Sequence, residues 1–180
     1  AVTAHAQKYE NFKVSSYIRA QDVLKMKDKA FLEQTWETVS SQVDLDKMYI
    51  ETHRDSIVVD EKTLKEVIRF FKSKGLEVGG GITYTISEPN DFQTFSYARQ
   101  PDREFVKYVA EYTAKFFDDF ILDDFFFIDV KNDDEIAAKG DRSWTEYRLE
   151  LMSKAGKELV VDPAHKVNPK CKVIIKYPNW

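Results

Sequence analysis

Five stretches of the chain are rich in apolar residues and turn polar at their carboxyl ends. This pattern predicts β-strands at 12–19, 47–54, 76–86, 120–127 and 171–176. The fourth stretch reads Phe-Ile-Leu-Asp-Asp-Phe-Phe-Phe, and an apolar run of this length is typical of a strand covered on both faces. Three glycines, 79–81, lie within the third stretch and indicate a bulge or a close approach by other groups.

Apolar residues spaced by three and four positions separate these strands and predict amphipathic helices. The helices are expected at 31–39, 60–74 and 105–116, and from about Ser143. The last is expected to be broken by Asp162-Pro163 and by Asn168-Pro169. The segment 87–103 has no helical stripe, and a loop of this length is often functional.

Strands that alternate with helices predict serial βα units and a parallel sheet, which is an α/β fold. Such units build a doubly wound sheet or a (β/α) barrel. The barrel is favoured, because no glycine-rich phosphate turn follows the first strand and polar residues follow every strand. A TIM barrel has eight strands and about 250 residues. The chain of 180 residues is therefore expected to hold about five of eight βα units. We expect an irregular segment at 1–11 and the amino-terminal portion of a (β/α)8 catalytic barrel at 12–180, with the remaining half of the barrel as its partner.

Composition narrows the classes of partner. With 43% hydrophobic and 14% aromatic residues, the chain has ample material for a core. A formal net charge of −4 without a Lys/Arg-rich run argues against nucleic acid as the main partner. Apolar stretches fall short of the roughly 20 residues of a membrane span, so no membrane partner is expected. The single cysteine, Cys171, allows no internal disulfide. The compartment is not fixed by the sequence, although a periplasmic or extracellular location is favoured if a signal peptide has been removed.

Two adjacent carboxylates, Asp123 and Asp124, end the most apolar stretch. Burying an ionised carboxylate in a dry core is costly, so the pair is expected at the open rim of the sheet. Ligands bind at the carboxyl rim of parallel strands, which makes the pair a candidate active site. Adjacent strand residues point to opposite faces, so one of the two is expected to face the pocket and the other to lie behind it. The alternative is that both cap the following loop.

Four short motifs give the chain a resemblance to a known family. They are Tyr-Ile-Glu-Thr-His-Arg at 49–54, Gly-Gly-Gly-Ile-Thr at 79–83, Leu-Asp-Asp-Phe-Phe-Phe at 122–127 and Lys-Tyr-Pro-Asn-Trp at 176–180. With them, the region 14–180 resembles the amino-terminal half of TIM-barrel glycoside hydrolases, particularly bacterial glycosidases whose fourth strand ends in an Asp-Asp-aromatic run. The resemblance implies a carbohydrate substrate and a nucleophile at Asp123 or Asp124. It places the acid/base carboxylate at the end of strand six, outside this sequence.

Further polar and aromatic side chains at the strand ends are candidates for binding sugar hydroxyls or for stacking on a sugar ring. They are Arg19, Glu51, His53, Arg54, Tyr84, Lys176, Tyr177, Asn179 and Trp180. The alternative for Glu51, His53 and Arg54 is an ion-pair network at a strand end.

The function expected from the sequence is cleavage of a glycosidic bond in an oligo- or polysaccharide by two carboxylates, without a cofactor or metal. One alternative is a metal-dependent hydrolase that uses His53 with the aspartates, although no HxH or HExxH spacing supports it. The other alternative is a carbohydrate-binding barrel without catalytic activity. His165 follows a helix in a proline-flanked segment and is expected to be a surface residue.

Overall fold

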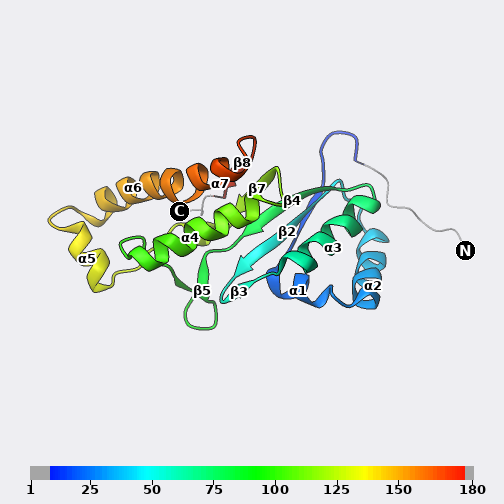
Figure 1. The fold of residues 1–180 in the computed structure, drawn as a ribbon, viewed down its shortest axis with the longest axis horizontal. Helices are drawn as coiled ribbons and strands as arrows, with labels where there is room; N and C mark the ends of the chain where they lie inside the picture. The colour runs from blue at the N-terminus through cyan, green and yellow to red at the C-terminus, as the bar shows by residue number, and fades with distance from the viewer. Residues whose placement is uncertain (1–8, 177–180) are drawn as a thin grey trace, which may run out of the picture.

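The structure is a computed structural model that describes residues 9–176. Its centre is a parallel sheet in the order β1-β2-β4-β7-β8 (Figure 1). These strands are β1 (Ser15–Ile18), β2 (Lys47–Arg54), β4 (Glu77–Ile82), β7 (Asp119–Leu122) and β8 (Lys172–Ile175). A short strand, β3 (Ile57–Val58), pairs antiparallel with β2. The predicted α/β class with a mostly parallel sheet is confirmed.

Neighbouring strands of the sheet follow one another along the chain, as expected of serial βα units. The sheet of the described residues is open, with β1 and β8 at its edges, and it is compatible with part of a barrel. The division of the chain into 1–11 and 12–180 stays a prediction.

The helices of the described residues are α1 (Ala20–Lys25), α2 (Lys29–Ser40), α3 (Glu61–Ser73), α4 (Gln100–Ala114), α5 (Asp133–Lys139), α6 (Trp144–Ala155) and α7 (Asp162–Val167). Helices α1, α3 and α4 contact strands of the sheet, and α7 packs against α4. Figure 1 shows α3 and α4 lying alongside the strands. Asp28 and Asp60 cap α2 and α3 by accepting hydrogen bonds from backbone N–H groups of the first turn. None of the helices in the described part of the chain is long and apolar enough to cross a membrane.

Several predicted boundaries were wrong. The predicted strand at 120–127 ends at Leu122, and a 3-10 turn, η1 (Asp124–Phe126), follows it. The predicted strand at 76–86 divides into β4 and a separate strand, β5 (Thr85–Ser87). The loop predicted at 87–103 contains β6 (Gln93–Thr94), which pairs with β5 in a hairpin, and the start of α4. The short helices α1 and α5 lie in segments for which no helix was predicted.

The expected break at Asp162-Pro163 does not occur. A π-helical segment, η2 (Gly156–Val161), joins α6 to α7, and Pro163 occupies the first turn of α7. Proline is tolerated in the first turn of a helix, where its missing N–H costs little. The helical stretch ends before Asn168-Pro169, as predicted.

The three glycines of β4 bring other groups close to the sheet, as predicted. A Cβ atom on Gly80 would lie 2.6 Å from a methyl carbon of Thr113 in α4. On the opposite face, a Cβ on Gly79 would lie 2.7 Å from the Tyr49 ring, and one on Gly81 would lie 2.5 Å from the Tyr17 hydroxyl. We call this opposite face, which carries Tyr17, Tyr49, Gly79 and Gly81, the inner face. The glycines let two tyrosine rings lie flat on it.

Candidate active site

A β-bulge in β2 decides which of its last residues reach the inner face. Glu51 pairs with Gly81 of β4, but the next paired residue of β2 is His53, opposite Ile82, so Thr52 is extra. A bulge breaks the alternation of side chains and re-aims those that follow. Arg54 therefore lies on the same side as Glu51, whereas Thr52 and His53 both turn towards α4.

Glu51 is completely buried and accepts hydrogen bonds with both carboxylate oxygens. The donors to Oε1 include the Tyr17 hydroxyl at 2.7 Å and the Thr83 hydroxyl at 2.5 Å. The backbone N–H of Ala20 donates to Oε2 at 2.6 Å. Arg54 adds three hydrogen bonds from Nε and Nη2, at 2.9 to 3.1 Å. The charge of Glu51 is thus fully compensated inside the protein.

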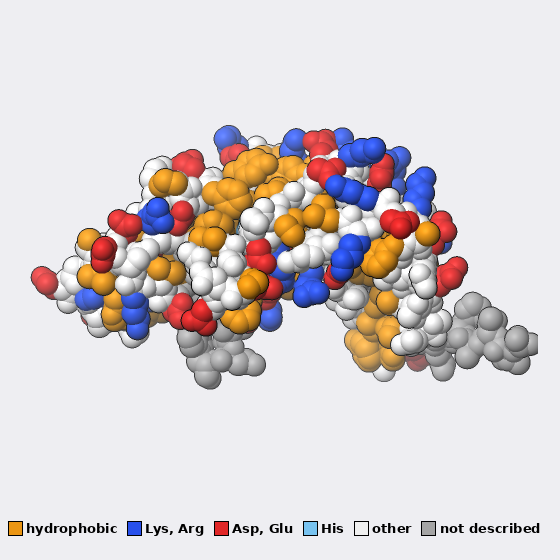
Figure 2. Space-filling model, turned by 90° about the horizontal axis from the view of Figure 1, so that it is seen from below, with side chains coloured by type: hydrophobic (Ala, Val, Ile, Leu, Met, Phe, Trp, Pro, Cys, Tyr) orange, Lys and Arg blue, Asp and Glu red, His pale blue; other side chains and the backbone are white. Residues whose placement is uncertain are grey.

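The Arg54 guanidinium links Glu51 to the carboxylates at the rim. Its Nη2 lies 3.4 Å from Oδ2 of Asp123 and donates to the Thr83 hydroxyl at 2.9 Å. Its Nη1 donates to Glu88, which follows β5. Figure 2 shows acidic and basic side chains side by side near the middle of the face viewed. One buried guanidinium thereby holds three carboxylates in place.

Asp123 and Asp124 both face the ammonium group of Lys176. Lys176 Nζ lies 3.0 Å from Oδ1 of Asp123 and 3.5 Å from Oδ1 of Asp124. The expectation that the two carboxylates point to opposite faces was wrong. The strand ends at Leu122, and Asp123 caps the turn that follows by accepting the Asp124 N–H at 2.9 Å. Side-chain alternation stops where the extended backbone stops.

The pKa values of the two carboxyl groups are shifted in opposite directions. Burial raises the pKa of Asp123, but hydrogen bonds from the Asp124 side chain and from Lys176 outweigh burial and lower this pKa to about 2. The hydrogen bond to Asp123 raises the pKa of Asp124, and burial adds to the increase. Asp123 is consequently the group that stays ionised, and Asp124 is the group that takes up the shared proton first.

A family model described as "probable glycosyl hydrolase, catalytic domain" matches residues 2–180. The chain belongs to this family. It is also 30% identical over 162 residues to an uncharacterized protein of the archaeon Saccharolobus solfataricus. That alignment covers 74% of this chain and 27% of the relative, so the chain spans about a quarter of the length of the relative it matches. No solved structure matches the chain.

Membership in a glycosyl hydrolase family confirms the predicted resemblance at the level of a glycosidase-like catalytic domain. The site described above brings five predicted residues together. These are Glu51, Arg54, Asp123, Asp124 and Lys176. Tyr177, Asn179 and Trp180 were also predicted to bind substrate, and they lie outside the described residues.

Three other predicted residues of this glycosyl hydrolase domain lie away from the carboxylates. His53 is completely buried, with its ring 5.3 Å from that of Phe105 in α4. Tyr84 is also completely buried, and its hydroxyl donates to the backbone of Val106 at 3.0 Å. The side chain of Arg19 is 58% exposed and lies 3.6 Å from Asp22. His53 and Tyr84 therefore pack the interface with α4 and do not face the rim.

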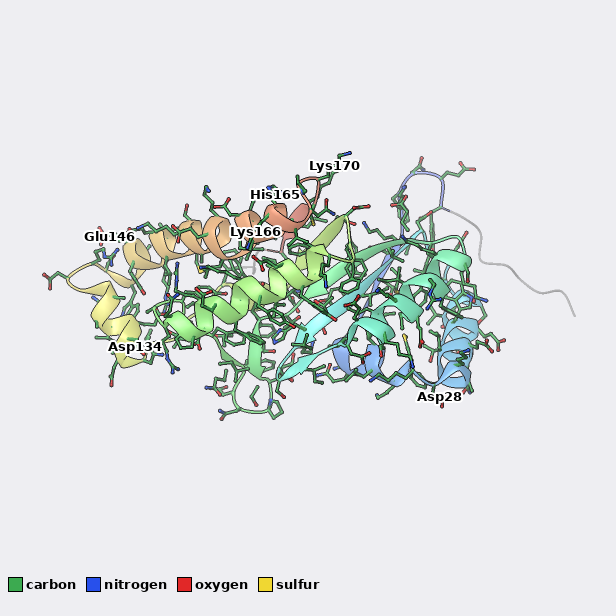
Figure 3. The ribbon with its side chains drawn as sticks, viewed as in Figure 1. Asp28, Asp134, Glu146, His165, Lys166 and Lys170 are labelled. Atoms are coloured by element: carbon green, nitrogen blue, oxygen red, sulfur yellow. The ribbon has the colours of Figure 1, made fainter. Side chains whose placement is uncertain are left out.

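The proposed use of His53 in a metal site finds no support in the geometry. Within residues 9–176, no three His, Cys, Asp or Glu side chains are grouped so that they could hold a metal ion. The Nδ1 atom of His53 lies 2.7 Å from the Thr83 carbonyl oxygen, which orients the ring away from the aspartates. His165 lies on α7 at the surface, beside Lys166 (Figure 3). Its Nε2 lies 2.9 Å from the carbonyl oxygen of Cys171.

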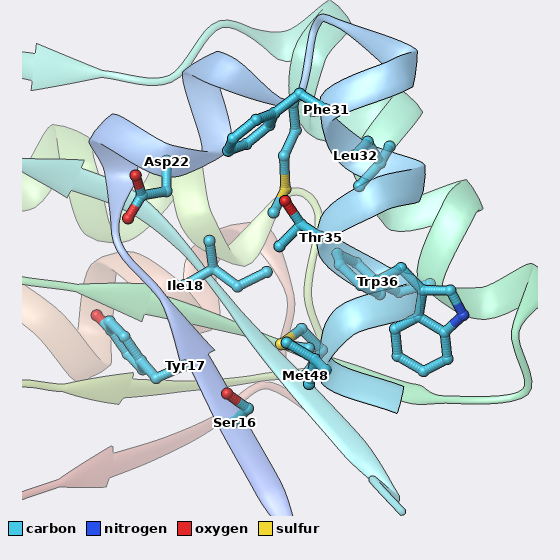
Figure 4. A pocket seen from close by; sticks show the side chains of 12 residues that line it. Ser16, Tyr17, Ile18, Asp22, Phe31, Leu32, Thr35, Trp36 and Met48 are labelled. Carbon is cyan, nitrogen blue, oxygen red and sulfur yellow. The ribbon is translucent and has the colours of Figure 1, made fainter. Parts of the chain in front are cut away.

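The candidate site does not coincide with the apolar cavity between α2 and the sheet. This cavity of about 210 Å³ is lined by residues such as Ile18, Leu32, Trp36 and Met48 (Figure 4). Its walls are mostly apolar, and Asp22 is the acidic residue among them. Hydrolysis by two carboxylates requires acidic groups on both sides of a bond, which this cavity does not provide.

Three residues of the site were missed by sequence reasoning. Tyr17 donates to Glu51, Thr83 joins Glu51 to Asp123, and Glu88 pairs with Arg54. Tyr17 and Thr83 lie within predicted strands. For Tyr17, the available sequence signal was the glycine run 79–81, which indicates a close approach by another group. Glu88 had no local signal, because only the fold of the β5–β6 hairpin brings it to Arg54.

Proposed function

We propose that this chain supplies one of the two catalytic carboxyl groups of a glycoside hydrolase, and that this group is Asp123. The supporting observation is the environment of its carboxylate. Three cationic or N–H groups hold it, and its low pKa keeps it ionised. An ionised, oriented carboxylate is what the nucleophile of a retaining enzyme, or the base of an inverting one, requires.

The two oxygens of Asp123 are held unequally. Oδ1 accepts from Asp124 N–H at 2.9 Å and from Lys176 at 3.0 Å. Oδ2 has only the longer contacts, at 3.3 Å to the Thr83 hydroxyl and 3.4 Å to Arg54. Oδ1 is the anchored atom, so Oδ2 is the oxygen that we assign to the reacting bond. A negative charge there also stabilises the oxocarbenium-like transition state.

Asp124 is not the second catalytic carboxyl group in this proposal. The two aspartate side chains are hydrogen-bonded to each other and contact the same ammonium group, so no sugar fits between them. Glu51 and Glu88 are paired with Arg54. We assign Asp124 to holding Lys176 and to sharing a proton with Asp123. The resemblance described above places the second carboxyl group on a later strand of the barrel.

The test compares Asp123→Asn with Asp124→Asn in the full-length protein. Initial rates are measured on a panel of aryl glycosides and oligosaccharides. Asp123→Asn is expected to lose about 10³-fold in kcat with its unfolding midpoint retained, and Asp124→Asn is expected to lose much less. Full activity of Asp123→Asn would refute the proposal. Binding of glycans by the wild-type protein without any product would instead indicate a carbohydrate-binding barrel.

A further inference from the structure

The tip of the β5–β6 hairpin has a backbone conformation that its residues do not favour. Asp91 and Phe92 have φ values of +50° and +51°. A bulky residue at positive φ is an outlier among non-glycine residues, and such strain is concentrated at functional sites. Glycine would adopt this conformation without strain, yet a phenylalanine occupies the position.

The hairpin tip is attached to the residues that hold Asp123. Glu88 pairs with Arg54, whose guanidinium also contacts Asp123. The Glu88 N–H donates to Oδ1 of Asp55 at 2.9 Å, and the Phe92 N–H donates to the Glu88 carbonyl at 3.2 Å. These bonds fix the tip beside the carboxyl rim.

Phe92 is one of the large hydrophobic side chains that this rim exposes to solvent. It is 53% exposed, and its ring stacks on Phe125 with 5.2 Å between centroids and 7° between planes. Phe125 directly follows Asp124 in the η1 turn. Two parallel rings therefore stand next to the aspartate pair, and the outer ring is open to solvent.

Phe92 also borders a cavity with polar walls. The cavity measures about 230 Å³ and lies between the hairpin and the segment that follows η1. Hydrogen-bonding side chains in its wall include Gln93, Arg99, Asp129 and Asn132. An aromatic face beside convergent donors and acceptors suits a pyranose ring, which has an apolar C–H face and a rim of hydroxyl groups.

We propose that Phe92 and this cavity form an accessory sugar subsite, which binds a sugar unit of the polymer beyond those that contact Asp123. The inference rests on the proposed glycosidase function and names the substrate class as a chain of several sugars. In this proposal the strained backbone conformation of Phe92 holds its ring in the position where it contacts the sugar. Short substrates reach Asp123 without occupying this subsite, so Phe92 contributes to binding only with longer chains.

The test measures binding by calorimetry in the Asp123→Asn background, where turnover is arrested. The probes are cellohexaose, maltohexaose, xylohexaose, mannohexaose and chitohexaose, each with its disaccharide. At least one hexasaccharide is expected to bind. Phe92→Ala should weaken that binding about tenfold and leave the disaccharide unchanged, whereas Phe92→Trp should retain it.

Phe12→Ala is the matched control. Phe12 is 60% exposed and stacks on Tyr9 at the opposite end of the strands, before β1, so its removal should leave hexasaccharide binding unchanged. Unchanged binding by Phe92→Ala would overturn the subsite, and so would failure of every hexasaccharide to bind. Full activity of Asp123→Asn would refute the proposed function alone. The subsite would then be tested by the effect of Phe92→Ala on KM for long and for short substrates.

Discussion

The Glu51 carboxylate accepts three hydrogen bonds from the guanidinium of Arg54, three residues along the same strand. Both side chains are buried, at 0% and 7% exposure. Residues three apart on a regular strand point to opposite faces, so this pair exists because of the bulge at Thr52. It connects the first strand, through Tyr17, to the carboxylates at the end of β7.

Glu51→Gln should destabilise the protein by about 3 to 5 kcal/mol, because it leaves the buried charge of Arg54 without its main partner. The free energy of unfolding is measured by urea titration. Glu77→Gln is the control, since it breaks the exposed ion pair with Lys13 and should not shift the midpoint measurably. Equal midpoints for the two variants would show that Glu51 is not needed to compensate Arg54.

Gly81→Ala should displace the Tyr17 ring, since the new Cβ would lie 2.5 Å from its hydroxyl and 2.6 Å from two ring carbons. We expect a loss of about 1 to 3 kcal/mol in unfolding free energy, as for other overpacked sites. Gly156→Ala has nothing within 4 Å of its Cβ and lies in a helix, so it should stabilise the protein by about 0.4 to 1 kcal/mol. A smaller cost of Gly81→Ala in a Tyr17→Leu background than in the wild type would confirm the clash as the cause.

Burial lowers the pKa of His53 to about 4, below its ordinary value of 6.5. The unfolded chain therefore binds a proton between pH 6.5 and 4 that the folded protein does not. The stability from this group is complete above pH 6.5 and is lost as the pH falls towards 4, by up to about 3 kcal/mol. His53→Phe should flatten the slope of unfolding free energy against pH in this window.

Glu135 is completely buried and connects the segment before α4 to helices α5 and α6. It accepts hydrogen bonds from the Ser96 hydroxyl at 2.8 Å, the Ala98 N–H at 3.1 Å and the Tyr147 hydroxyl at 2.6 Å. Glu135→Ala leaves these donors unsatisfied and should cost about 2 to 4 kcal/mol in thermal or chemical unfolding. Asp134→Asn changes an exposed neighbour and should have little effect. A mild effect of Glu135→Ala would mean that water replaces the carboxylate.

Much of the fold could be predicted from the sequence, because local apolar periodicity reports burial. The predicted strand at 47–54 has the bounds of β2, and the stripe predicted at 60–74 became α3, with Leu64, Val67 and Phe71 buried. The glycines of β4 were correctly interpreted as a site of close approach. This interpretation also needs only the local sequence, because glycines within a strand leave space that a neighbouring side chain fills.

The sequence by itself determined that the chain is α/β, that its strands follow one another in the sheet, and that two aspartates end an apolar strand. Only the tertiary structure decided which side chains meet around them. The turn of His53 towards α4 depends on a bulge set by the register with β4. The common orientation of Asp123 and Asp124 depends on the strand ending at Leu122, and the position of Glu88 depends on a hairpin. Register, strand ends and loop placement come from contacts between distant segments, which a local pattern of apolar and polar residues does not encode.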